Sequence, residues 1–116
     1  MYADVLRMEN EIMIVNQKHA LFEEHFPQFS VLPGAFSIVG CIEGVKKILN
    51  KTIDKNYQLQ MIQKVSFLKP IKPGMKLMIK VIKVVDSMET KLVIFLLQDD
   101  MYQNYLKGIL IFGENA

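Results

Sequence analysis

Residues 25–49 read HFPQFSVLPGAFSIVGCIEGVKKIL, and the second part of this stretch decides what the rest of the chain has to build around. Ala35–Leu49 has the length and composition of a helix. Its first ten residues contain a single charged side chain, Glu43, so the helix is apolar nearly all round. Such a helix typically lies inside a protein, not on its surface. The sequence therefore predicts one long buried helix that ends near Asn50.

The preceding segment, residues 25–34, predicts a stiff loop that carries a titratable group. Pro27 and Pro33 restrict the backbone φ angle within that loop. Pro33-Gly34 turns the chain into the helix, whose first backbone N–H groups have no acceptor within the helix itself. His25 thus stands shortly before a helix N-terminus. A general base beside such N–H donors is what proton transfer next to a carbonyl requires.

After the helix the apolar residues recur at every second position, which is the period of strands. In Tyr57–Phe67 they alternate with glutamine, lysine and serine, whereas Leu92–Leu97 is apolar throughout and favours a central strand covered on both sides. The other expected strands are Tyr2–Met8, Glu11–Val15, Met75–Val85 and Tyr105–Phe112, of which the first two form a hairpin around Glu9-Asn10. One helix with five or six antiparallel strands is an α+β architecture, and 116 residues predict a single domain, 1–116.

Two motifs follow one another along the chain. The first is His25-Phe26-Pro27, followed by Pro33-Gly34 and the apolar helix, and the second is FLKPIKPGMKL at Phe67–Leu77. Together they resemble the active-site loop and the F-x-x-P-V-x-P-G-D-x-L segment of the (3R)-hydroxyacyl-[acyl-carrier-protein] dehydratases of bacterial fatty-acid synthesis. The resemblance implies the hotdog fold, in which an antiparallel sheet wraps round one long central helix. It also implies a dimer whose sheets pair edge to edge, with the active sites at the interface.

For the chemistry, the resemblance implies that His25 is a general base that removes a C2 proton from a 3-hydroxyacyl thioester. Loss of the 3-hydroxyl group then gives the trans-2-enoyl product. The backbone N–H of Gly34 or Ala35 would bind the thioester carbonyl at the positive end of the helix dipole. The substrate channel is expected to include Phe26, Pro33, Phe36 and Val39. Outside this motif, His25 would be interpreted as a structural residue bonded to a loop carbonyl, and Gly34 as an ordinary turn.

The sequence departs from the family at the catalytic acid. The family has a glutamate or aspartate fourteen residues after the histidine, a position that Val39 occupies in this chain. Glu43 follows one helical turn later on the same face, since residues four apart point the same way. Glu43 is therefore the candidate acid, acting from a shifted position. An ion pair of Glu43 with Lys46 or Lys47 is an equally weighted interpretation.

These observations define a first hypothesis and two alternatives. The first is a 3-hydroxyacyl thioester dehydratase of fatty-acid or polyketide-type biosynthesis, acting on substrates carried by phosphopantetheine, with no metal and no redox cofactor. The alternatives are a hotdog acyl thioesterase and a non-catalytic acyl-binding or partner subunit of a hotdog heterodimer. The expected partners are an acyl carrier protein or a coenzyme A thioester, and a second copy of the chain in a homodimer, with a heterodimer as the alternative.

Charge and composition narrow the class of protein further. Residues 46–83 carry ten lysines and one aspartate, which form either a solvated basic surface or a docking patch for an acidic partner. Arginine is almost absent, which argues against nucleic acid, and no apolar run reaches the ~18–20 residues of a membrane span. The lone Cys41 is expected in the core, and with the lack of a signal peptide it predicts a cytoplasmic protein. The eight methionines are expected to fill the core.

Overall fold

The computed structural model describes residues 6–9, 11–15, 34–52 and 57–114. In these residues the chain forms one helix, α2 (Gly34–Thr52), and six strands. The strands are β1 (Leu6–Glu9), β2 (Ile12–Val15), β3 (Tyr57–Phe67), β4 (Lys76–Asp86), β5 (Thr90–Gln98) and β6 (Asn104–Glu114). The predicted hairpin and the later strands are confirmed, with bounds that shift by one or two residues for most of them. The part of the first predicted strand before Leu6 lies outside the described residues.

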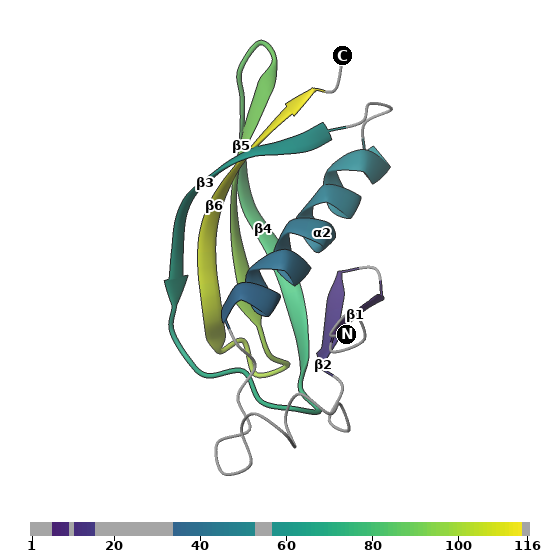
Figure 1. Ribbon diagram of the computed structural model, residues 1–116, viewed down its shortest axis with the longest axis vertical. Coiled ribbons are helices and arrows are strands. Elements are labelled where there is room, and N and C mark those ends of the chain that lie inside the picture. Colours follow the sequence, from purple (N-terminus) through teal and green to yellow (C-terminus); the bar gives the residue numbers. More distant parts are fainter. Residues whose placement is uncertain (1–5, 10, 16–33, 53–56, 115–116) are drawn as a thin grey trace.

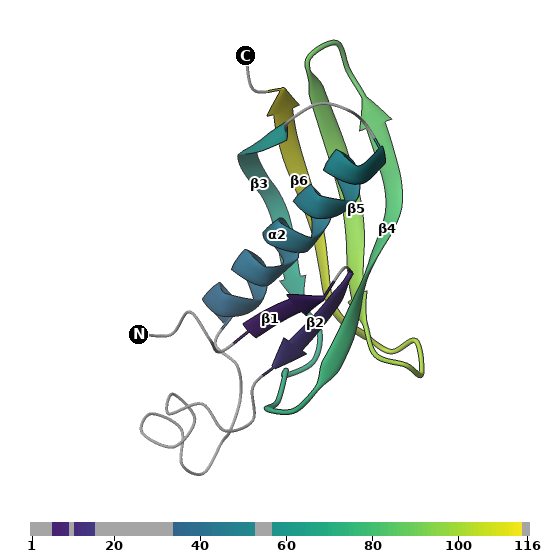
Figure 2. The ribbon, with the colours of Figure 1, turned by 90° about the vertical axis from the view of Figure 1, so that its right-hand side faces the viewer.

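The six strands form one antiparallel sheet in the order β1-β2-β4-β5-β6-β3. Figures 1 and 2 show that this sheet curves and that α2 lies along its concave side. Cys41, Val45 and Leu49 of the helix are buried against the sheet. The α+β prediction, an antiparallel sheet wrapped round one long central helix, is therefore confirmed.

Helix α2 continues to Thr52, two residues past the predicted end at Asn50. The side chain of Asn50 connects this end of the helix to the sheet, because its Oδ1 accepts a hydrogen bond from the backbone N–H of Tyr57 at 3.2 Å. This contact ties the last turn of the helix to the first residue of β3. It sets where β3 starts relative to the helix.

The two faces of the sheet differ in burial. On β5, Val93, Phe95 and Leu97 point toward the helix and are buried, whereas the residues between them are half-buried. The face that lies opposite the helix is called the outer face below. The expectation that β5 is covered on both sides is thus wrong for the described part of the chain, where the helix covers one side only.

Gly108 leaves room for the ring of Phe95 to lie over the neighbouring strand. It pairs with Phe95 on β5 and with Val65 on β3. A Cβ atom at Gly108 would lie 2.6 Å from Cε1 of Phe95, so the buried ring occupies the space that any other residue would fill. The glycine that interrupts the last apolar run of the sequence is therefore a packing requirement of the core.

Strand β3 is one edge of the sheet and is irregular. The pairing of β3 with β6 shifts register twice, between Leu59 and Met61 and between Ile62 and Lys64. Each shift inserts an extra residue, as β-bulges do. Met61 and Ile62 are exposed at this edge. An apolar edge strand of this length is a surface on which another strand can pair.

Candidate functional site

Helix α2 starts at Gly34, where the sequence places the carbonyl-binding N–H groups. The hydroxyl of Ser37, a buried residue, donates to the Gly34 carbonyl at 2.7 Å and closes the first turn. No acidic side chain lies in that turn, so no carboxylate of the turn itself offsets the positive end of the helix dipole. The ring of Phe67, at the end of β3, covers Gly34 closely enough that a Cβ there would lie 2.9 Å from its Cζ atom. The helix N-terminus and the β3 edge are thus direct neighbours.

One side of α2 has no cover from the described part of the chain. Ala35, Val39, Glu43, Lys47 and Lys51 are exposed and follow one another at intervals of four residues. These five residues form what we call the open stripe. The predicted burial of the helix is confirmed on the face that packs against the sheet, whereas the open stripe stays exposed in the described part of the chain.

Val39 and Glu43 share this stripe, as their spacing predicts. Val39 is 59% exposed although it is apolar, which indicates a surface meant for contact with something else. Glu43 forms no ion pair with Lys46 or Lys47, so the structure does not support the ion-pair interpretation. Lys46 turns instead toward Gln58 of β3, with its Nζ 3.4 Å from Oε1. The carboxylate of Glu43 therefore has no cation from these neighbours.

Of the other predicted site residues, Ala35 lies in the open stripe and Phe36 packs against the core from a half-buried position. His25, Phe26 and Pro33 lie outside the described residues, so their roles stay predictions. The structure thus brings Gly34, Ala35, Val39 and Glu43 together on the first half of one helix.

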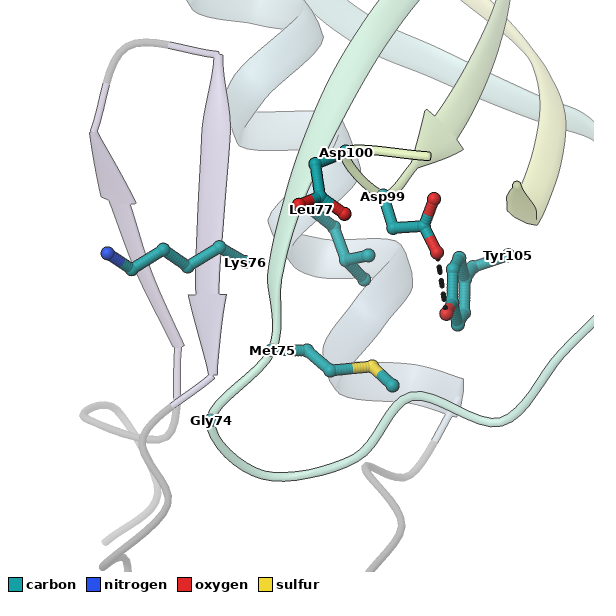
Figure 3. A pocket seen from close by; sticks show the side chains of 7 residues that line it. All are labelled: Gly74, Met75, Lys76, Leu77, Asp99, Asp100 and Tyr105. Atoms are coloured by element: carbon teal, nitrogen blue, oxygen red, sulfur yellow. Dashed lines mark hydrogen bonds between the residues drawn. The ribbon is translucent and has the colours of Figure 1, made fainter. Parts of the chain in front are cut away.

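A cavity of about 420 Å³ lies near the start of β4, and the sequence did not predict it. Figure 3 shows its walls: the side chains of Met75 and Leu77 on one side and that of Tyr105 on the other, while Lys76 points away. It is lined by Gly74, Met75, Lys76, Leu77, Asp99, Asp100 and Tyr105. These residues come from three separate segments of the chain. Gly74–Leu77 end the second sequence motif, but nothing in the sequence indicates that they lie beside Asp99, Asp100 and Tyr105.

Asp99 organises one wall of this cavity. Its Oδ2 accepts a hydrogen bond from the Tyr105 hydroxyl at 3.0 Å, and its Oδ1 accepts the backbone N–H groups of Met101 and Gln103 at 2.9 Å each. The bond from Gln103, followed by that from Tyr105, lowers the pKa of Asp99. Burial, and then the bond to Asp99, raises the pKa of Tyr105. Asp99 thus stays ionised and Tyr105 stays neutral, a pairing that holds a turn in place.

The remaining candidates for chemistry are limited. Cys41 is 1% exposed, and burial raises the pKa of its thiol to about 12, so the predicted core role is confirmed. Among the described residues, no group of three or more His, Cys, Asp or Glu side chains lies where it could hold a metal ion. Within the same residues, no helix has both the length and the apolar character that crossing a membrane requires.

Comparisons with solved structures define the class of fold. The protein smu.793 of Streptococcus mutans, solved with bound acetyl CoA, is 14% identical and superimposes with a TM-score of 0.68 over 96% of this chain and 87% of its own. The Escherichia coli PaaI protein from the phenylacetic acid degradation operon is 9% identical, with a TM-score of 0.71 over 90% of this chain and 72% of its own. At these identities the likeness shows the fold alone, and it is the hotdog fold.

A third structure is an acyl-CoA hydrolase of Staphylococcus aureus in complex with butyryl coenzyme A. It is 20% identical, with a TM-score of 0.63 over 75% of this chain, and the chain spans about half (54%) of that protein. No curated protein matches the sequence. The family model of the ApeI-like dehydratases matches residues 6–108, so the chain belongs to the ApeI-like dehydratase family.

Proposed function

We propose that this protein is a 3-hydroxyacyl thioester dehydratase that acts on substrates carried by an acyl carrier protein, in fatty-acid or polyketide-type biosynthesis. The observation that carries the proposal is the match of residues 6–108 to a dehydratase family. The geometry of α2 agrees with it, because the helix offers an N-terminus without acidic side chains beside an open stripe. Both features suit a thioester whose carbonyl gains negative charge during the reaction.

In the proposed mechanism the thioester carbonyl oxygen binds the backbone N–H of Gly34 or Ala35. His25 removes a proton from C2, and the electron pair left behind forms the C2–C3 double bond while the C3–O bond breaks. The departing hydroxyl takes a proton from Glu43 and leaves as water. His25 returns its proton to Glu43, directly or through water, before the next turnover. The substrate arrives on phosphopantetheine, and the reaction needs neither a metal nor a redox cofactor.

Glu43 is proposed as the acid because Val39 cannot donate a proton. The two side chains lie one helical turn apart, about 5.4 Å along the axis. An acid at Glu43 therefore serves a substrate that sits one turn further along α2. The absence of an ion pair with Lys46 or Lys47 leaves its carboxyl group available for this role.

The open stripe also supports a proposal about assembly. A second copy that pairs its β3 edge with this one, at Met61 and Ile62, would extend the sheet and bring its own surface next to α2. Val39 and Glu43 would then face a closed chamber in place of solvent. Two copies of this chain in a homodimer would close the chamber in this way. A heterodimer with an acid-bearing hotdog chain is the alternative.

Two other functions each have one observation in their favour. Hydrolysis of an acyl thioester is supported by the hydrolase among the structural neighbours, and Glu43 would then activate water. A non-catalytic partner subunit is supported by Val39, which stands where the family's acid is expected. Both share the fold, the thioester ligand and the dimer with the main proposal.

The purified chain should be assayed on 3-hydroxyacyl and acyl thioesters of both acyl carrier protein and coenzyme A. Dehydration produces an enoyl thioester that absorbs in the ultraviolet, whereas hydrolysis releases a thiol. We expect the enoyl product, a rate that falls by about 10²–10⁴-fold in Glu43→Gln, and a complete loss in His25→Ala. Val39→Glu should raise the rate, because it restores a carboxyl group at the family's position.

The matched control is Glu11→Gln, which removes an exposed carboxylate from the turn between β1 and β2 and should leave the rate unchanged. Thiol release without enoyl product would assign the hydrolase. A folded dimer that produces neither compound would leave only the partner-subunit function. Wild-type rates in Glu43→Gln would remove Glu43 from the mechanism.

A further inference from the structure

The outer face of the sheet is apolar at its centre. Register places Leu92, Ile94 and Leu96 of β5 beside Ile109 and Ile111 of β6 on this face. All five are half-buried in the described part of the chain. A sheet with one face in water normally alternates apolar and polar residues, so five apolar residues here call for an explanation.

Lysines border this centre on both sides. One row across the sheet runs Lys80, Leu96, Lys107 and Ser66, and the next runs Lys83, Ile94, Ile109 and Lys64. The four lysines are exposed, and Lys80 lies over the ring of Tyr102 with its Nζ 5.4 Å from the ring centre. The outer face thus combines an apolar centre on β5 and β6 with lysines on β4, β6 and β3.

Carboxylates are missing from the outward positions of β3–β6. The two acids within these strands face the other way: Asp86 pairs in register with Lys91 and forms an ion pair with it, and Glu114 pairs with Tyr57. Both partners are buried on the helix side. Within β3–β6, the positive charge of the outer face is therefore not offset by acids of the same face.

Exposed long apolar side chains add to this surface. Met61 and Met78 occupy outward positions and are 55% and 47% exposed, and Met101 beside Tyr102 is 73% exposed. The expectation that the methionines fill the core is wrong for these three. Tyrosine, lysine and flexible apolar side chains together are the composition of surfaces that lie at a membrane interface.

We propose that the outer face binds an anionic lipid surface, with the apolar residues of β5 and β6 against the lipid and the four lysines on its phosphates. The charge favours this occupant over a second copy, because two such faces in contact would bring lysines toward lysines. It is favoured over a protein, because a fluid surface adapts to a curved sheet and to cations spread over three strands. The half-buried position of the central residues predicts shallow adsorption, held mainly by charge and weakened by salt.

The structure also divides the basic region of the sequence into two groups. Lys46, Lys47 and Lys51 belong to α2, on the side of the candidate site, whereas Lys64, Lys80 and Lys83 belong to the outer face. The two groups point to opposite sides of the sheet. Lipid binding by the second group is independent of the reaction proposed above.

The test is co-sedimentation of the full chain with vesicles of phosphatidylglycerol and phosphatidylcholine, compared with vesicles of phosphatidylcholine alone. We expect binding to the anionic vesicles only, and release in ~1 M salt, where the Debye length is about 3 Å. The pair Lys80→Gln with Lys83→Gln should lower the affinity by about 25-fold, roughly fivefold for each lysine. A second pair, Lys64→Gln with Lys107→Gln, should give a loss of similar size.

The control is Lys46→Gln with Lys47→Gln, which removes the same charge from α2 and should bind anionic vesicles as the wild type does. Circular dichroism and thermal melting check that each pair folds, and activity on thioesters should be unchanged in both outer-face pairs. Equal binding to both kinds of vesicle, equal losses in all three pairs, or no binding to anionic vesicles would overturn the proposal. Loss of carrier-protein binding in the outer-face pairs, without any vesicle binding, would assign the face to an acidic protein instead.

Discussion

The two faces of strand β5 are built from the same kinds of residue but meet different surroundings. Val93, Phe95 and Leu97 are at most 1% exposed beneath α2, whereas Leu92, Ile94 and Leu96 alternate with them on the outer face and are half-buried. The strand is apolar on both faces, yet the described part of the chain covers only the face beneath α2. Composition therefore indicates that a face of a strand is apolar, but it does not indicate what covers that face.

The difference has an energetic side. Removing apolar surface from water is worth roughly 25 cal/mol per Å², so the helix side supplies most of the stabilisation within one chain. The outer face retains apolar surface that a lipid or another partner can still bury. The same strand thus serves stability with one set of side chains and interaction with the other.

The largest expected effect on stability comes from a substitution on the helix side of β5. Phe95→Ala should lower the free energy of unfolding by about 3–5 kcal/mol, because it removes a fully buried ring and leaves a cavity. Ile94→Ala, one residue away on the outer face, should cost about 1 kcal/mol. Urea unfolding followed by circular dichroism measures both, and equal losses would show that the outer face is covered in solution.

A smaller effect is expected where the strands approach most closely. Gly108→Ala would place a methyl group 2.6 Å from the Phe95 ring and should cost about 1–3 kcal/mol through overpacking. The cost should largely disappear in a Phe95→Ala background, since the ring is then absent. A cost that persists in the double variant would trace to the backbone of β6 and not to the ring.

The smallest effects on stability are expected from two side-chain hydrogen bonds near the β5–β6 turn, one on each face of the sheet. Tyr105 donates to Asp99 on the helix side, and Gln98 donates to Asn104 at 2.8 Å on the outer face. Because the folded pKa of Asp99 is lowered, its contribution is present above the unfolded pKa of about 3.9 and is lost as pH falls through the folded value. Tyr105→Phe should therefore lower the melting temperature modestly at pH 7 and less at pH 3.

The outer-face counterpart serves as the control. Asn104→Ala removes a hydrogen bond between two neutral amides, so its effect on the melting temperature should be the same at both pH values. A Tyr105→Phe effect that is also independent of pH would mean that the charge of Asp99 does not contribute through this bond.

Most of the fold was predictable from the sequence, because the strands and the helix each show the hydrophobic pattern typical of that element. The alternation in Tyr57–Phe67 marks β3 with the bounds that the structure gives, and the uncharged start of the helix marks α2 to within three residues. Burial was predicted less well, because Leu92–Leu97 and the helix are apolar on sides that the described part of the chain does not cover. Such sides depend on partners, which local periodicity does not encode.

The candidate site was predictable where it depends on one helix. A spacing of four residues puts Val39 and Glu43 on one stripe, and Pro33-Gly34 marks the helix start at Gly34. The cavity beside Tyr105 was missed, because strands distant in sequence meet there and no periodic signal links Met75 to Asp99. The proposed role of His25 as the base rests on the sequence motif alone, because His25 lies outside the described residues.

The place of β3 in the sheet has a consequence for how the protein is made. Strand β3 leaves the ribosome soon after α2, but the strand that pairs with it in the described sheet, β6, is made after β4 and β5. Contacts between such distant segments form late, and an unpaired edge carrying Met61 and Ile62 can meanwhile pair with other chains. Nascent chains that stop before Asn104 would thus hold an apolar helix and strand without the surface that completes them, so the final eleven residues of the sheet, Asn104–Glu114, govern whether the earlier ones reach the folded state.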